Sequence, residues 1–200
     1  MIAAGAVNRD SPAPVIRKAQ RLIGNQLMLR NADLSDAGFI VELRTDPQKQ
    51  RFISATSADL AQQIAWLERY ARTPEEAYFI VENLAGDKVG TIRIYDAVED
   101  SFCFGSWIMK DGAPVTYAVE SVLIVYHYAL DELGFNRSYF AVRKANRSVW
   151  QFMEKFGGLR IRETDVDYWY ETQRAPVLES FQRYVHLLPK GIRVLHDPVS

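Results

Sequence analysis

The strongest constraint on the fold is a change of hydrophobic period inside the 200-residue chain. Over residues 33–46 and 57–73, apolar side chains recur at the three- and four-residue spacing of a helix. Residues 77–84, 89–95 and 101–109 are instead rich in β-forming residues, and short polar turns join them. Three such runs in succession predict an antiparallel meander of strands that follows two helices.

The rest of the chain alternates between the two periods. The predicted elements are a strand at 26–30, a long helix that ends at Gly134, a strand at 138–143, a helix led by Asn146, strands at 159–162 and 166–171, and a helix at 176–188. This order predicts an α/β fold with a mixed sheet, in which the antiparallel meander is followed by a β-α-β-α-β core and helices cover both faces.

The predicted elements place one domain at residues 26–188, because no internal linker is long enough to divide it. Residues 1–25 are interpreted as an N-terminal arm, with a short amphipathic helix over residues 15–23. Residues 189–200 are interpreted as an irregular tail. The arm and the C-terminal helix could both serve contacts in a homodimer.

Composition excludes several classes of function. The net charge of −1 gives no basic surplus for nucleic acid, and no apolar run reaches the length of a membrane span. The single cysteine, Cys103, rules out an internal disulfide, and the three histidines show no metal-ligand spacing. The first residues lack the basic region of a secretory signal. We therefore expect a cytoplasmic protein without a metal.

Four stretches of the chain carry a resemblance to a known family. They are LMLRNADLSDAGFIVELRTDP (27–47), FGSWIM (104–109), YAVESVLIVYHYALDELGFNRSYFAVRKAN (117–146) and NRSVWQFMEKFGG (146–158). Together, in this order and spacing, they resemble the GNAT superfamily of acyl-CoA-dependent N-acyltransferases. The resemblance spans residues 26–172 and is to the branch that acetylates ribosomal-protein N-termini. The run GSWIM…AP…AVES…VRKAN also resembles members tied to surface-polysaccharide and nucleotide amino-sugar acetylation.

The resemblance implies acetyl-CoA as co-substrate. A loop that feeds a helix N-terminus offers backbone N–H groups to a pyrophosphate, and here that segment is 113–118. Diverging strands can hold the pantetheine arm as an added strand. The cofactor-binding residues it implies are Trp107, Ile108, Met109, Val115, Thr116, Tyr117, Ala118, Asn146 and Val149.

Several positions depart from the family pattern. Pro114 and Thr116 stand where the family's phosphate loop has small residues, and proline has no N–H to donate. In the family pattern, a tyrosine that protonates the CoA thiolate stands where this chain has Met153, and a glutamate stands where it has Cys103. Acyl transfer still needs a proton acceptor for the amine. Glu120 is our first candidate for a catalytic base because it lies beside the expected loop. Glu163, Asp165 and Asp167 are the alternatives.

The resemblance favours a small-molecule amine on a nucleotide-linked amino sugar as acceptor. Arg44 and Arg93 would then bind its diphosphate, because arginine matches phosphate bidentately. One alternative is acetylation of a protein N-terminus or a small amine. Another is a GNAT-like binding module without catalysis, which the missing loop glycines and the missing tyrosine both favour.

Overall fold

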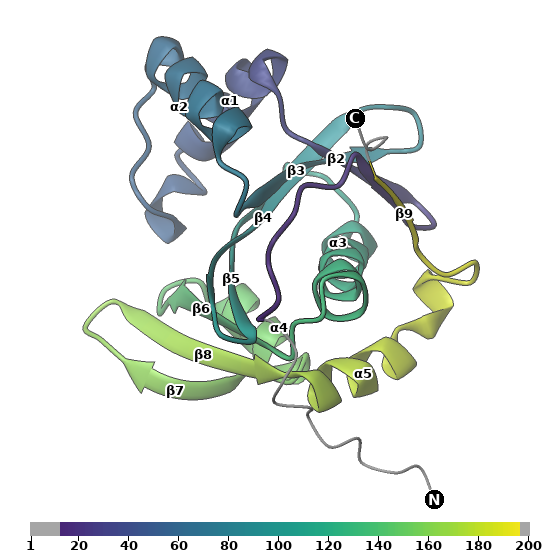
Figure 1. Cartoon of the computed structure of the whole chain (residues 1–200). Helices are drawn as coiled ribbons and strands as arrows, with labels where there is room; N and C mark the ends of the chain where they lie inside the picture. Colours follow the sequence, from purple (N-terminus) through teal and green to yellow (C-terminus); the bar gives the residue numbers. More distant parts are fainter. Residues whose placement is uncertain (1–12, 197–200) are drawn as a thin grey trace, which may run out of the picture.

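The computed structural model describes residues 13–196 and contains a nine-stranded mixed sheet (Figure 1). Its strand order is β7-β8-β6-β5-β4-β3-β2-β1-β9. The strands are β1 (Arg21–Ile23), β2 (Leu27–Asn31), β3 (Ala77–Asn83), β4 (Lys88–Val98), β5 (Ser101–Met109), β6 (Arg137–Arg143), β7 (Leu159–Glu163), β8 (Asp167–Gln173) and β9 (Arg193–Leu195). The predicted meander is confirmed as β3–β4–β5. β5 and β6 form the parallel pair that makes the sheet mixed.

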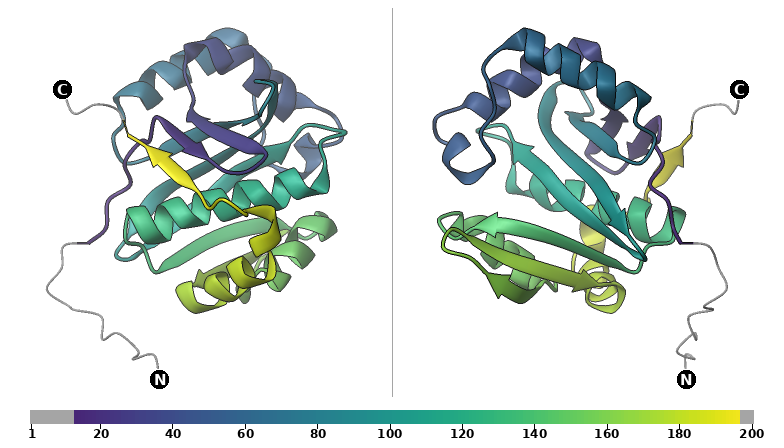
Figure 2. Two further views of the ribbon diagram at one scale, coloured as in Figure 1. Left: turned by 90° about the vertical axis from the view of Figure 1, so that its right-hand side faces the viewer. Right: turned by 60° about the vertical axis from the view of Figure 1, so that its left-hand side comes forward.

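Helices cover both faces of the sheet, as predicted (Figures 1 and 2). On one face, α1 (Ala37–Thr45) and α2 (Leu60–Arg72) pack over a small core that includes Ile40, Leu67 and Tyr70. On the other face, α3 (Val115–His127), its π-helical extension η3 (Tyr128–Glu132), α4 (Arg147–Lys155) and α5 (Arg174–Arg183) enclose the main core. Short 3₁₀ turns occupy Leu34–Asp36 (η1), Gln50–Phe52 (η2) and Val185–Leu187 (η4).

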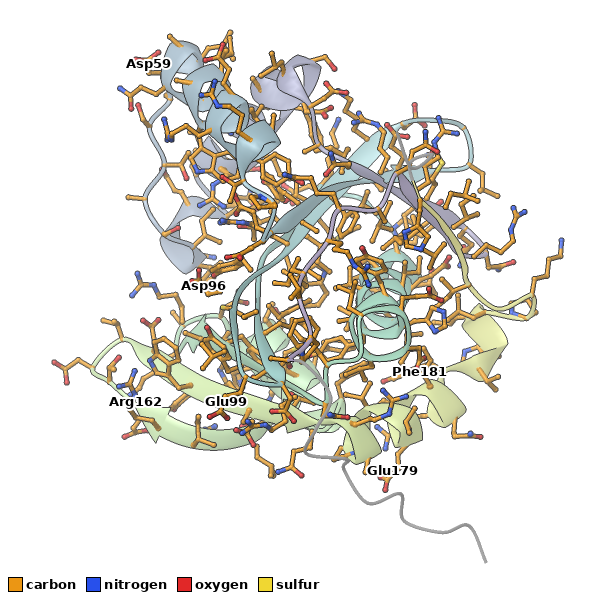
Figure 3. The ribbon with its side chains drawn as sticks, viewed as in Figure 1. Asp59, Asp96, Glu99, Arg162, Glu179 and Phe181 are labelled. Carbon is orange, nitrogen blue, oxygen red and sulfur yellow. The ribbon has the colours of Figure 1, made fainter. Side chains whose placement is uncertain are left out.

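Capping residues explain where the first two helices begin. Asp33 forms a capping box with Asp36 ahead of α1, and the Asp59 side chain accepts a hydrogen bond from Ala61 N at 2.8 Å ahead of α2 (Figure 3). Both starts agree with the sequence-based prediction. The segment between the helices, residues 46–59, contains η2 and lies beside the functional site.

The helix predicted over residues 15–23 is wrong. Residues 21–23 form strand β1, which pairs with β2 through Arg21↔Arg30 and Ile23↔Met28. Such a short helix is marginal by itself, whereas here Ile16 and Leu22 are buried in the main core. Tertiary packing therefore outweighs the helical pattern.

The predicted irregular tail also contains a strand. Residues 193–195 form β9, which pairs with β1 (Figure 2). Strands from outside residues 26–188 thus contribute to the sheet. The rest of the predicted arm and tail, residues 1–12 and 197–200, lies outside the described residues.

Candidate active site

The site begins where the parallel pair β5–β6 separates. Pairing runs only from Ser101↔Arg137 to Cys103↔Tyr139, although both strands continue well beyond these residues. Past this point their facing backbone groups are not bonded to each other. An amide-bearing chain can therefore add itself between them as a strand.

A bulge in β5 lies directly beside this opening. Pairing with β4 passes from Thr91↔Ile108 to Arg93↔Gly105, so β5 carries one extra residue here. Ser106 has a φ of 47°, and its carbonyl accepts a hydrogen bond from Thr91 Oγ1 at 2.8 Å. A bulge leaves a residue outside the ladder and redirects its backbone groups. An N–H group freed in this way is suited to stabilise an oxyanion.

The opening is part of a cleft of about 300 Å³, which we call the acyl cleft. Small residues from β5 and β6, Gly105 and Ala141, line it in the middle. Across the sheet, Ala141 pairs with Trp169 and Gly105 pairs with Arg93. Trp169 lines the cleft beside Ala141, and the small size of Gly105 and Ala141 leaves room for the hollow.

A second pocket, of about 320 Å³, adjoins the acyl cleft and contains both predicted substrate residues, Arg44 and Arg93. We call it the arginine pocket. It shares Arg44, Ser54, Tyr95 and Ser106 with the acyl cleft. Among the described residues no carboxylate lines it, whereas hydroxyl and amide side chains do. The structure therefore offers a place for an anion next to the cleft.

Neighbouring side chains fix both guanidinium groups. Arg44 donates from Nε to Thr56 Oγ1 at 2.7 Å and from Nη2 to Ser54 Oγ at 3.0 Å. Arg93 pairs with Glu76 and lies 4.2 Å from the ring centroid of Tyr95. Its Nε is buried and has no hydrogen-bond partner within residues 13–196. Held in this way, the two cations lose little side-chain freedom on binding an anion.

Five of the predicted cofactor residues lie on β5 or at the start of α4, which flank the opening. Trp107, Asn146 and Val149 line the acyl cleft, and Trp107 Nε1 donates to Ser121 Oγ at 3.2 Å. Met109 ends β5 and is half-buried. Ile108, by contrast, is buried at 5% exposure, so only its backbone could serve a ligand.

Asn146 is not held as a helix cap. It precedes α4, yet within the described chain its side chain makes no capping hydrogen bond to the helix backbone. Its Oδ1 accepts only from Ser148 Oγ, at 3.4 Å. The amide group is therefore available to a ligand in the acyl cleft.

The other four predicted cofactor residues, 115–118, form the first turn of α3, with Val115 81% exposed. Tyr117 N is already bonded to Pro114 O at 2.9 Å. Nearby, Lys49 Nζ contacts Asp111 Oδ1 at 2.5 Å and Asp46 Oδ2 at 2.8 Å. Burial lowers the pKa of Lys49, but these two partners outweigh it and raise the pKa overall. Lys49 thus keeps a positive charge beside the acidic residue of this unusual loop.

The structure does not place Glu120 at the site. Its carboxylate is fully buried, and Oε1 accepts hydrogen bonds from the backbone N–H groups of Asn25, Gln26 and Leu27 at 2.7–3.1 Å. It does not line the acyl cleft. A carboxylate engaged by three backbone donors stabilises the β1–β2 turn, so the prediction of Glu120 as base is corrected.

The ionisable groups that do line the acyl cleft include Cys103, Tyr95 and Asp167. Burial raises the pKa of the Cys103 thiol to about 11 and also raises the pKa of Tyr95. Both groups are therefore protonated at neutral pH. Asp167 is the one carboxylate lining the cleft in the described part of the chain, and its Oδ1 lies 3.4 Å from Arg143 Nη1. Glu163 and Asp165, the other two alternatives, do not line it.

Sequence analysis did not single out Tyr95, Ser54 or Thr56. Tyr95 could have been found from strand alternation, because residues two apart in a strand share a face and Tyr95 follows Arg93 by two. Ser54 and Thr56 belong to the α1–α2 connection. No periodic signal places such a connection over a sheet.

The comparisons with known proteins agree with this geometry. The family model of the acetyltransferase (GNAT) domain matches residues 26–158, which is more than half of the chain. A solved structure of apo FdhC, described as a nucleotide-linked sugar GNAT, is 34% identical, with a TM-score of 0.75, and covers 84% of this chain and 98% of its own. The chain therefore belongs to the GNAT acetyltransferase family and is an N-acetyltransferase.

More distant structures share the fold. A GCN5-related N-acetyltransferase from Brucella melitensis is 15% identical with a TM-score of 0.70, covering 86% of this chain and 89% of its own. A mutant of the spermidine N-acetyltransferase SpeG from Vibrio cholerae is 16% identical with a TM-score of 0.67, covering 76% of this chain and 96% of its own. The search of curated proteins found no match.

Two further findings concern residues 13–196. No helix in this range is long and apolar enough to cross a membrane. No group of three or more histidine, cysteine, aspartate or glutamate side chains in it could hold a metal ion.

Proposed function

We propose that this enzyme transfers an acetyl group from acetyl-CoA to the amine of a nucleotide-linked amino sugar. The observation that carries the proposal is the arginine pocket, which joins the acyl cleft and holds Arg44 and Arg93 without a lining carboxylate among the described residues. A pocket of this kind favours an acceptor that carries phosphates. The likeness to a nucleotide-linked sugar GNAT at 34% identity supports the same class of acceptor.

The residues present fit acetyl-CoA, which supplies the acetyl thioester when bound. The separated strands β5 and β6 can take its amide-bearing arm, with Trp107, Asn146 and Val149 beside it. The first turn of α3, residues 115–118, can offer backbone N–H groups to its phosphates. Pro114, which lacks an N–H, only precedes this turn.

The chain's own groups can serve the transfer as follows. Asp167 accepts the proton of the attacking amine, directly or through water. The bulge at Ser106 offers a backbone N–H to the oxyanion. The thiolate is a good leaving group and needs no protein acid, which agrees with Met153 in the place of a tyrosine.

The first test is thermal unfolding of the full chain with acetyl-CoA, with ATP as control. A ligand at a hundredfold excess over its Kd stabilises by about 2.7 kcal/mol, which shifts Tm by a few degrees. A shift with acetyl-CoA and none with ATP supports the cofactor. If the Tm with acetyl-CoA equals the Tm with ATP, the result would instead favour a GNAT-like module that does not bind acetyl-CoA.

The second test is thiol release with a nucleotide-linked amino sugar and with the same amino sugar lacking the nucleotide. We expect turnover of the linked form, and a KM about tenfold higher in Arg44→Ala or Arg93→Ala, corresponding to about 1.4 kcal/mol. Equal kcat/KM for both substrates would favour the rival function, acetylation of a small amine or a protein N-terminus. A positive result would suit a cytoplasmic step that supplies surface-polysaccharide synthesis.

A further inference from the structure

The arginine pocket does not end at its two arginines. A further hollow of about 390 Å³ lies along α2 and shares Thr56, Gln63 and Trp66 with the arginine pocket. We call this hollow the α2 groove. The acyl cleft, the arginine pocket and the α2 groove therefore form one continuous path, which runs from the separated strands to the surface of α2.

Two polar groups at the start of the α2 groove have no partner in the described part of the protein. Gln63 and Trp66 are half-buried and three residues apart, so they lie on the same face of α2. Within residues 13–196, no hydrogen bond engages the Gln63 side-chain amide or Trp66 Nε1, although neighbouring polar side chains are engaged. Both groups are therefore free to form hydrogen bonds with a ligand.

The adjacent glutamine shows the contrast. Gln62 also lines the α2 groove, but it is exposed and donates from Nε2 to Asp59 Oδ2 at 3.1 Å. Gln62 has therefore already committed a donor to the helix cap. Gln63 has the same chemistry one residue further on and retains its full hydrogen-bonding capacity.

The ring of Trp66 is held in place. It stacks on Tyr70 with centroids 5.6 Å apart and an angle of 4°, and it meets the Tyr78 ring edge-on at 5.6 Å. The Arg93 guanidinium lies 5.2 Å from its centroid. The indole N–H thus has a fixed position beside the proposed phosphate-binding arginine, and a ligand need not order it.

We propose that the α2 groove binds the nucleobase of a nucleoside diphosphate, with Gln63 and Trp66 as its hydrogen-bonding groups. This inference rests on the proposed function. The order of groups along the path is the order along a nucleotide-linked sugar: the amine at the acyl cleft, the diphosphate at Arg44 and Arg93, and the base at α2. A side-chain amide presents a donor and an acceptor together, as the edge of a base does.

The test is calorimetric binding of UDP, dTDP and inorganic pyrophosphate to the full chain with CoA at saturation, which blocks the cofactor site. For wild type we expect both nucleotides to bind at least tenfold more tightly than pyrophosphate. For Gln63→Ala we expect a tenfold weaker Kd for UDP or dTDP and an unchanged Kd for pyrophosphate. Glu68→Ala, on the exposed surface of α2 and outside the α2 groove, is the control and should leave all three unchanged.

Each other outcome overturns the inference in a distinct way. If the Kd values of Gln63→Ala equal those of the Glu68→Ala control, the base does not bind at the α2 groove, and Trp169→Phe then tests whether it binds on the far side of the acyl cleft. If Gln63→Ala weakens pyrophosphate as much as UDP, its effect is not on base recognition. If Arg44→Ala leaves every Kd unchanged, the proposed diphosphate site is wrong as well. If Arg44→Ala weakens binding and Gln63→Ala does not, the proposed function stands and only the proposed base site is wrong.

Discussion

Two carboxylates, Glu120 and Asp167, show how differently the two faces of the sheet are built. Glu120 lies on α3, is fully buried and accepts from three backbone N–H groups. Asp167 begins β8, has 24% of its side chain exposed, lines the acyl cleft and has one ion-pair partner, Arg143, at 3.4 Å. The first is saturated by its neighbours, and the second keeps lone pairs for a substrate.

The difference teaches that closeness in sequence to an expected cofactor loop does not identify a base. What matters is the number of partners that the folded protein already supplies. Glu120 serves the stability of the fold, whereas Asp167 retains hydrogen-bonding capacity for chemistry. The predictions below test this division, beginning with the largest expected effect.

Glu120→Ala should destabilise the fold by about 3 kcal/mol or more, because it leaves three backbone donors without an acceptor. Glu120→Gln keeps an acceptor oxygen and should cost less. Chemical denaturation measures both, and Glu68→Ala on exposed α2 is the control. In folded Glu120→Gln, kcat should stay near the wild-type value, and a hundredfold loss would restore Glu120 as base.

Asp167→Asn should lower kcat about a hundredfold, or about 2.7 kcal/mol in activation free energy, while Tm changes little. Steady-state kinetics of thiol release measures it. Asp165→Asn is the control, because Asp165 lies near Asp167 but outside the acyl cleft. An Asp167→Asn enzyme with wild-type kcat would remove Asp167 from the reaction and leave proton removal to solvent.

Gly24→Ala should destabilise by about 2 kcal/mol, because overpacking strains a well-packed site. Its added Cβ would lie 2.5 Å from Glu120 Oε1 and 2.7 Å from Ile124 Cδ1. Gly38→Ala on α1 is the matched control, since a Cβ there meets nothing within 4 Å. Helix propensity predicts that this control stabilises slightly. Equal unfolding midpoints for the two variants would contradict the tight packing around Glu120.

Cys103→Ala should have the smallest effect and leave kcat within about threefold of wild type, since a protonated thiol is a poor nucleophile. With a pKa of about 11, the thiol should also resist alkylation by iodoacetamide at pH 8 and react as the pH approaches 11. Fast labelling at pH 8, with loss of activity, would show that the thiol is ionised in the cleft.

Much of the fold was predictable because local signals agreed with tertiary packing. The meander and the starts of α1 and α2 follow from alternation and from capping by Asp33 and Asp59. Strand β1 was missed because its short sequence has a helical pattern, and only pairing with β2 and β9 decides its conformation. A three-residue strand is too short to show a hydrophobic period, so its pairing with distant strands cannot be predicted from the sequence.

The site was harder to predict from sequence. Arg44 and Arg93 were predicted from the sequence as substrate-binding residues, and in the structure both line one pocket. The direction of Glu120 could not be inferred, because all eight residues from Val119 to Tyr126 are buried. A helix that is buried on all sides has no polar face that would indicate which of its side chains point toward the site.

The pairing of β1 with β9 bears on how the protein is made in the cell. Residues 21–23 are synthesised long before their partners at 193–195. Until these partners are made, one edge of β1 has no neighbour and remains open to pairing with another strand. The sheet therefore reaches its full width only after residues 193–195 have been made, and a nascent chain stalled before residue 193 would expose this edge to aggregation.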